Sequence, residues 1–188
     1  TLYSLIKDKP YFVVTSNTDE HFERAGFEPG SIFELEGSMC EMQCAGGCHD
    51  GVYSNRETVL TMLEQEWEME VPTHYLPKCP VCGGPMQLHV PVNQNFIYGS
   101  KWENQRQNYQ HFVQRFHNKK LLILEFGIGS RNQMIKAPFM QIVDQEPDAF
   151  YITFNRGDLY IPQKIQKKAL GVDGDLKEQL AAIQDAME

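Results

Sequence analysis

The sequence predicts an α/β protein in which a parallel sheet carries helices on both faces, with a small cysteine-rich module in the middle of the chain. Short apolar runs rich in β-branched and aromatic residues alternate with stretches of helical periodicity, and small or polar loops follow the runs. Between residues 36 and 116 the alternation of strand and helix patterns is interrupted, and the composition shifts toward cysteine, glycine and proline. We therefore expect one sheet domain from residues 1–37 and 118–188, with residues 38–117 inserted as a zinc-binding and helical module.

The strands and helices follow one another in a regular order. Residues 11–15 are predicted to form a buried strand, residues 18–25 a helix that Gly26 ends, and residues 31–35 another strand. Two capping boxes, Ser54-x-x-Glu57 and Ser100-x-x-Glu103, precede apolar stripes that indicate helices packed on the core. The expected elements after the module are a strand at 121–126, a helix near 134–144 containing Pro138, a strand at 150–154 and a helix from 176 onward.

Composition and charge exclude several classes of function. The 188 residues suffice for one domain and a small module, and 41% hydrophobic with 22% charged residues is ordinary for a soluble protein. A net charge of -8 argues against nucleic acid as the main partner. No apolar run is long enough to span a membrane and no secretion signal is present, so we expect a cytoplasmic protein. Leu2, Leu5 and Ile6 have helical spacing without a preceding cap, so we expect a longer protein whose N-terminal part comes before Thr1.

Five cysteines lie within the inserted region: Cys40, Cys44, Cys48, Cys79 and Cys82. Cys44 and Cys48 form one close pair in the sequence, and Cys79 and Cys82 form another. Each pair can bring two thiolates from one turn to the same ion, and two such turns complete a tetrahedral zinc site. In a chain without secretion signals, metal binding is favoured over disulfides. Four thiolates leave no open coordination position, so the predicted site is structural. Spacing alone leaves Cys40 as an alternative to Cys44, and His49 as an alternative to Cys48.

A polar segment follows the first predicted strand. Thr15-Ser-Asn-Thr-Asp leads into a helix, and the carboxyl end of a strand is where α/β sheets bind ligands. The short side chains of Ser16, Asn17 and Asp19 can hydrogen-bond an amide or a ribose. Capping of the helix by Asn17 or Thr18 is the structural alternative.

The whole pattern resembles the sirtuin family. The motif Thr-Gln-Asn-Ile-Asp-x-Leu-His-x-x-Ala-Gly of sirtuins is matched at Thr15, Asn17, Asp19, Ala25 and Gly26. Glu34-Leu-Glu-Gly-Ser38 resembles the sirtuin Glu-Leu-His-Gly-Ser, and Cys44 lies where sirtuins place their first zinc ligand. The resemblance covers essentially the whole chain, and it implies a Rossmann-like sheet together with NAD and zinc as cofactors.

Residue by residue, the resemblance implies a division of roles. Asn17 and Asp19 would act at the nicotinamide end with Ser16 and Thr18 beside them, and Gly127, Gly129 and Ser130 would lie near the phosphates and the adenosine ribose. Asn155 would bond that ribose, and the backbone at Asp173 would flank adenine. Zinc would be held by Cys44, Cys48, Cys79 and Cys82, which leaves Cys40 without an assigned role. The sirtuin Gly-Ala-Gly-x-Ser phosphate loop would lie before Thr1.

Glu36 stands where sirtuins carry their general-base histidine. Segments such as Cys79-Pro-Val-Cys-Gly and Ile-Lys-x-Pro-Phe139 resemble the macrodomain-linked (class M) sirtuins, which also lack that histidine and commonly carry Gln. The resemblance implies an ADP-ribosyltransferase that modifies a lipoylated glycine-cleavage H-like carrier protein, with a macrodomain protein as a further partner. Protein-lysine deacylation is an alternative that a carboxylate base serves poorly, since its pKa is about 4.3 against about 6.5 for imidazole. A non-catalytic nucleotide-binding zinc protein is the second alternative.

Overall fold

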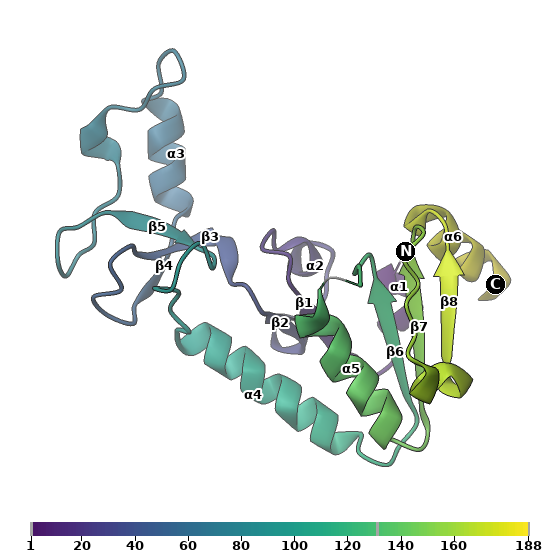
Figure 1. Ribbon diagram of the computed structural model, residues 1–188. Coiled ribbons are helices and arrows are strands. Elements are labelled where there is room, and N and C mark those ends of the chain that lie inside the picture. The colour runs from purple at the N-terminus through teal and green to yellow at the C-terminus, as the bar shows by residue number, and fades with distance from the viewer. Residues whose placement is uncertain (1, 131, 188) are drawn as a thin grey trace. The chain divides into compact units, whose positions relative to one another are not determined.

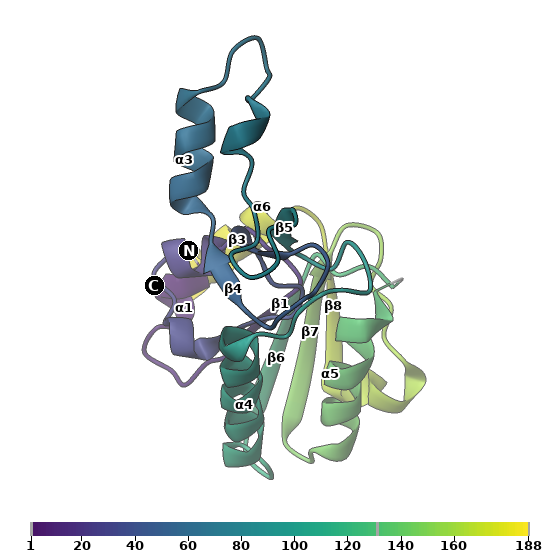
Figure 2. The ribbon, with the colours of Figure 1, turned by 90° about the vertical axis from the view of Figure 1, so that its left-hand side faces the viewer.

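The computed structural model describes residues 2–130 and 132–187, which form two compact units (Figures 1 and 2). One unit is Tyr11–Gln110, and the other joins Thr1–Pro10 to His111–Glu188. Both contain helices and parallel strands, so the α/β prediction with parallel sheets flanked by helices is confirmed. Among the described helices, none has the length and apolar character that a membrane crossing requires.

The unit Tyr11–Gln110 begins with two parallel strands, β1 (Val13–Thr15) and β2 (Ile32–Glu34). Thr15 pairs with Glu34, so both polar side chains lie at the carboxyl ends of their strands. The connection contains α2 (His21–Arg24) and the 3-10 turn η1 (Pro29–Ser31). Helix α2 is shorter than predicted, because the polar segment before it forms a loop. Phe33 packs edge-to-face on Trp102 of α4 (Ser100–Arg115), with ring centroids 5.1 Å apart.

The same unit contains the cysteine-rich module, built on a three-stranded antiparallel sheet in the order β4-β3-β5. Its strands are β3 (Ser38–Cys44), β4 (Val52–Ser54) and β5 (Met86–His89), and it also contains α3 (Arg56–Glu64) and η2 (Thr73–Tyr75). The predicted core role of the α3 stripe is wrong, since Leu63 is 64% exposed, Trp67 is 77% exposed, and Trp67 lies beyond the helix. The N-cap of α3 is Asn55 rather than Ser54 of the predicted capping box.

The unit of Thr1–Pro10 and His111–Glu188 contains a parallel sheet in the order β6-β7-β8. Its strands are β6 (Leu121–Phe126), β7 (Ala149–Asn155) and β8 (Ala169–Asp173), with helices α1 (Leu2–Ile6), α5 (Gln133–Gln145), η3 (Gln163–Lys168) and α6 (Leu176–Met187). Figure 1 shows α5 lying along this sheet. Met140 and Val143 of α5, Tyr151 of β7 and Ile165 of η3 form its buried core with Ala149.

The strands of the two units belong to separate sheets. The compact units meet in sequence at Pro10–Tyr11 and Gln110–His111, whereas the expected boundaries lay at residues 37–38 and 117–118. The expected domain of residues 1–37 with 118–188 stays a prediction, and its terminal residues Thr1 and Glu188 lie outside the described chain.

Candidate functional site

The loop after β1 is shaped by its own short polar side chains. The Thr15 hydroxyl accepts a hydrogen bond from the Asn17 backbone N–H at 3.0 Å, and Asp19 Oδ1 accepts one from the His21 N–H at 3.0 Å. Such local bonds compete with helix formation, which explains why the helix begins only at His21. The bond from the His21 backbone also lowers the pKa of Asp19, so this carboxylate stays ionised at neutral pH.

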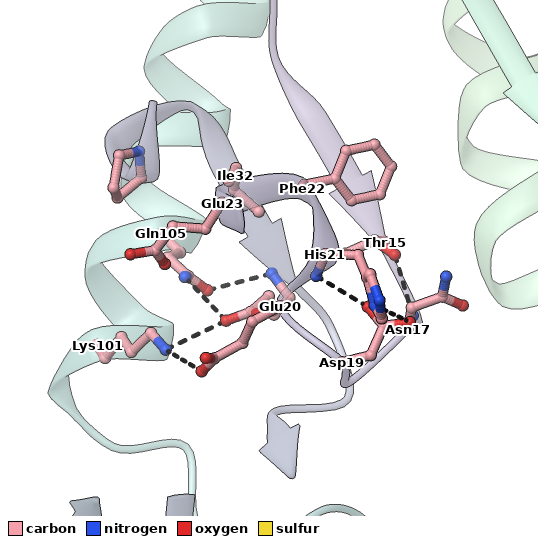
Figure 3. Close-up of a pocket in the computed structure, with 12 residues that line it drawn as sticks. Thr15, Asn17, Asp19, Glu20, His21, Phe22, Glu23, Ile32, Lys101 and Gln105 are labelled. Carbon is pink, nitrogen blue, oxygen red and sulfur yellow. Dashed lines mark hydrogen bonds and ion pairs between the residues drawn. The ribbon is translucent and has the colours of Figure 1, made fainter. Parts of the chain in front are cut away.

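Asn17 and Asp19 line a small pocket together with groups from β2 and α4 (Figure 3). The cavity volume is about 30 Å³, room for one or two water molecules. The residues that line it include Thr15, Glu20, Glu34, Lys101 and Gln105, whereas Ser16, Thr18 and Glu36 lie outside it. The structure thus brings two of the predicted residues together with side chains that sequence did not select.

Lys101 joins three carboxylates beside this pocket. Its ammonium nitrogen lies 3.2 Å from Glu34 Oε2, 3.3 Å from Glu41 Oε1 and 3.8 Å from Glu20 Oε1. Gln105 holds Glu34 further, because its Oε1 accepts the Glu34 backbone N–H at 3.1 Å. Burial alone would lower the pKa of Lys101, but the charges of Glu34 and Glu41 outweigh it and raise that pKa. The ammonium group is therefore a permanent positive charge at the pocket.

The histidine of β5 extends this network into the cysteine-rich module. His89 Nε2 lies 2.7 Å from the Ile97 carbonyl oxygen, which only accepts, so Nε2 carries a proton. His89 Nδ1 lies 3.2 Å from Glu41 Oε2. His89 is buried and stacks on Phe96, with centroids 4.8 Å apart.

Glu36, the predicted catalytic carboxylate, is exposed. Within the part of the chain that the structure describes, its carboxylate has no hydrogen bond or ion pair. The following Gly37 is buried at φ +73°, and a Cβ there would lie 2.1 Å from the His89 carbonyl oxygen. The backbone after Glu36 is therefore fixed by close packing, while the Glu36 side chain is exposed.

The other predicted residues gather at the carboxyl edge of the β6-β7-β8 sheet. Gly127 follows β6, Asn155 ends β7 and Asp173 ends β8, with Asn155 and Asp173 paired in register. Asn155 Nδ2 donates to the Ile128 carbonyl at 3.2 Å, and Asp173 Oδ1 accepts the Gly157 N–H at 2.8 Å. This is the edge at which parallel α/β sheets bind ligands.

The glycine loop after β6 is open on one side and held on the other. Gly127 has φ +67°, which favours glycine, and a Cβ there would meet no atom within 4 Å. Asp158 Oδ2 accepts the Ser130 N–H at 2.6 Å, and this backbone bond lowers the pKa of Asp158. A Cβ at Gly129 would lie 3.3 Å from the same carboxylate oxygen. The loop therefore leaves space for a ligand group beside the backbone of Gly127.

The four predicted ligand cysteines converge on one point, which could hold a metal ion. The sulfurs of Cys44, Cys48, Cys79 and Cys82 all lie within 4.8 Å of one another. The Cys44–Cys82 and Cys48–Cys79 pairs are 3.7 and 3.6 Å apart, close to the roughly 3.8 Å edge of a tetrahedron with zinc–sulfur bonds of about 2.3 Å. Cys40 is not part of this group.

The protonation of the cluster is suited to a cation. A hydrogen bond from the Cys48 backbone lowers the pKa of Cys44 to about 6, and one from the Cys82 backbone lowers that of Cys79. Burial and the neighbouring sulfurs raise the pKa of Cys48, because one thiolate opposes another. A dication would remove that opposition. His49 stays outside the four, with Nδ1 3.2 Å from the Cys48 sulfur and Nε2 2.8 Å from the Tyr53 hydroxyl.

Sequence reasoning missed Glu20, Lys101, Gln105 and the polar role of Glu34. Lys101 and Gln105 lie within the helix predicted after the Ser100 capping box, and their spacing of four places both on one helix face. This shared face could have indicated a polar site, because a Lys and a Gln in line with the aromatic stripe are not typical of a hydrophobic core.

Two parallel sheets with polar residues at the carboxyl ends of their strands are features of α/β proteins that bind ligands at such edges. No protein-family model matches the chain. The chain is similar to a Staphylococcus aureus (strain Mu50) protein named protein ADP-ribosyltransferase, with 29% identity over 177 residues. The match covers 93% of this chain and 56% of that protein, so the chain spans about half the length of its relative.

Proposed function

We propose that the protein is a sirtuin-like, NAD-dependent protein ADP-ribosyltransferase. The similarity to the staphylococcal protein ADP-ribosyltransferase along 93% of the chain carries this proposal. The sirtuin-like motif from Thr15 to Gly26 supports NAD as the donor, because its matching residues Asn17 and Asp19 line a pocket.

The nucleotide half of NAD is assigned to the carboxyl edge of the β6-β7-β8 sheet. Gly127 and Gly129 lack side chains and would let the phosphates approach the loop closely, with Ser130 beside them, and Asn155 offers an amide to a ribose hydroxyl. Asp173 lies where the adenine would be flanked by backbone. The open space at Gly127 supports this assignment, because a Cβ there would meet no atom within 4 Å.

The chemical step is assigned to the loop after β1. The bond between C1′ of the ribose and the nicotinamide nitrogen breaks, and its electron pair leaves with the now neutral nicotinamide. Positive charge develops on the ribose, and the ionised Asp19 with the Asn17 amide stabilises it. A nucleophile of the acceptor protein forms the new bond to C1′, and its proton, if it carries one, passes to solvent or to a base such as Glu36.

The four cysteines are assigned to a structural zinc ion. Their sulfur distances fit a tetrahedral Zn²⁺, which supplies folding free energy rather than an open position for substrate.

The acceptor that we propose is a lipoylated glycine-cleavage H-like carrier protein, with a macrodomain protein as a further partner. This finer assignment is supported by the resemblance to class M sirtuins, whose missing histidine corresponds to Glu36 here. Placement in the cytoplasm is part of the same proposal.

Protein-lysine deacylation is the second candidate, since ordinary sirtuins share the same motif. It requires a base for a ribose hydroxyl near neutral pH, and an exposed carboxylate such as Glu36 is a weak one. A non-catalytic nucleotide-binding zinc protein is the third, and it would bind NAD without releasing nicotinamide.

One experiment separates the three candidates. The full-length protein is incubated with NAD labelled in the adenosine moiety and lipoylated carrier, and in parallel with NAD and an acyl-lysine peptide. Transfer predicts labelled carrier, and Glu36→Gln should retain it within about threefold, because an ionised acceptor needs no base. Deacylation without any labelled protein would favour the second candidate, and absence of nicotinamide release would favour the third.

A further inference from the structure

Glu20 has an unusual backbone directly after Asp19. Its φ of 55° and ψ of 21° are left-handed, a region that residues other than glycine seldom occupy. Glu20 also stands at the N-cap of α2 without making a side-chain cap. Such strained positions persist only where surrounding contacts hold them, and they gather at functional sites.

The carboxylate of Glu20 makes those contacts. Its Oε1 accepts the Ser38 hydroxyl at 2.6 Å. The same oxygen lies 3.8 Å from the Lys101 ammonium nitrogen (Figure 3). Ser38 is fully buried, so it is a fixed donor, and its own Oγ accepts the Cys40 N–H at 3.0 Å. The side chain therefore turns away from its helix and joins the loop to β3.

Lys101 connects this turn to two other strands. It also pairs with Glu34 at the end of β2 and with Glu41 in β3, so three carboxylates share one ammonium group. Without that group the carboxylates repel one another at a half-buried place. Glu20 is the member whose backbone is strained, so it is the one we expect to move.

We propose that Lys101 and Glu20 are positioning residues that hold the Asn17–Asp19 loop in its working orientation. Lys101 neutralises the carboxylates. Glu20, held by its contacts to Ser38 and Lys101, keeps the left-handed turn that directs the side chains of Asn17 and Asp19 into the pocket. This inference rests on the proposed function for its effect on catalysis.

The kinetic test uses Lys101→Met, Lys101→Arg and Glu20→Gln in the full-length protein. Lys101→Met should lower the rate constant for nicotinamide release at least tenfold, while the dissociation constant for NAD changes less than about threefold. Lys101→Arg should restore most of the rate, because it keeps the charge. The double variant Lys101→Met with Glu20→Gln should release nicotinamide no more slowly than the slower single variant, since both substitutions remove the same Glu20–Lys101 contact. Lys164→Met, which breaks an exposed ion pair to Asp144, is the matched control.

A second measurement does not depend on activity. Hydrogen exchange of the backbone N–H groups of Asn17 and His21, which donate to Thr15 and Asp19, should accelerate at least tenfold in Lys101→Met and stay unchanged in Lys164→Met. Unchanged exchange in Lys101→Met would overturn the inference even if activity fell. If exchange accelerates in Lys101→Met but the protein releases no nicotinamide, the positioning role of Lys101 and Glu20 would be supported and the proposed function would be rejected. A general loss of thermal stability in Lys101→Met and Lys101→Arg alike would assign Lys101 a purely structural role and overturn the inference.

Discussion

Two of the carboxylates on Lys101, the buried Glu34 and the half-buried Glu41, have opposite electrostatic environments. Burial raises the pKa of Glu34, and the charge of Lys101 offsets this only in part. Burial also acts on Glu41, but its bond to His89 and the charge of Lys101 prevail, so the pKa of Glu41 is lowered. Neighbouring carboxyl groups whose pKa values diverge are a feature of sites that move protons.

The pH dependence follows from these directions. A carboxyl group with a folded pKa above its unfolded value of 4.5 stabilises the fold fully below pH 4.5 and loses that contribution as pH rises through the folded pKa. Glu41 behaves in the opposite sense, and its contribution is lost as pH falls through its folded pKa. Carbon-detected NMR titration should therefore find Glu34 titrating at higher pH than Glu41. Lys101→Met should raise both pKa values, and an unchanged Glu34 would show that Lys101 does not act on it.

Asn17 and Asp19 could be selected from sequence because their chemistry is local. A polar loop directly after a strand predicts where these side chains lie, and both line the pocket. Lys101 could not be selected in this way, since it lies more than 60 residues from Glu34 and their contact exists only after α4 packs on β2. Glu36 was selected by resemblance alone, and its freedom from contacts is a property that only the structure shows.

Helix α2 shows how local bonds override a predicted element. The pattern from residue 18 to 25 has helical character, but Thr15 and Asp19 bond nearby backbone N–H groups and delay the helix to His21. The parallel strands were predictable, because short runs of β-branched and aromatic residues bounded by turn residues favour strands. The exposure of the apolar face of α3 was not predictable, because helical periodicity shows that one face is apolar but not whether another element covers that face.

The cysteine cluster predicts a module that depends on its metal. Cys82 is exposed, so Cys82→Ala leaves little cavity and its effect on stability reports the lost ligand. Apparent binding free energies of structural zinc are on the order of 10 kcal/mol, which exceeds what a small module can otherwise supply. Cys82→Ala should lose near-stoichiometric zinc and unfold the module, as measured by metal analysis and circular dichroism. Cys40→Ala should keep its zinc, and zinc retained without both Cys79 and Cys82 would refute the assignment.

Strand β6 and helix α5 are joined by a buried ion pair. Lys136 and Glu125 are almost fully buried, and Glu125 also accepts the hydroxyls of Tyr151 and Thr153. Removing one partner of a buried pair leaves an uncompensated charge and typically costs about 3–5 kcal/mol. Lys136→Met should therefore lower the free energy of unfolding by that amount in denaturant titrations.

Two further variants isolate the charge from the packing. Glu125→Gln combined with Lys136→Met should be more stable than Lys136→Met alone, because no unpaired carboxylate remains. Lys164→Met, at an exposed pair, should change stability by less than about 1 kcal/mol. Equal effects of Lys136→Met and Lys164→Met would show that the buried pair adds nothing.

The two compact units have different chemistry at their parallel strand ends. In one, Gly127 leaves open space after β6 and Asn155 ends β7, which suits a phosphate and sugar ligand. In the other, Asn17 and the ionised Asp19 lie beside a charged network, which suits the stabilisation of developing charge. The sequence orders these features along the chain, whereas their separation into two sheets is seen only in the structure.

This difference predicts that substitutions in the two units change different kinetic parameters. Asn155→Ala removes a proposed ribose contact, so it should weaken NAD binding by up to about tenfold with little change in kcat. Asn17→Ala removes a group that acts on the developing charge, so kcat for nicotinamide release should fall on the order of 10²-fold with little change in NAD affinity. Calorimetric titration and a nicotinamide-release assay measure the two quantities separately. Asn104→Ala, at an exposed position of α4, should leave both unchanged. If Asn17→Ala and Asn155→Ala altered the same parameter to the same extent, the assignment of binding to one unit and chemistry to the other would be wrong.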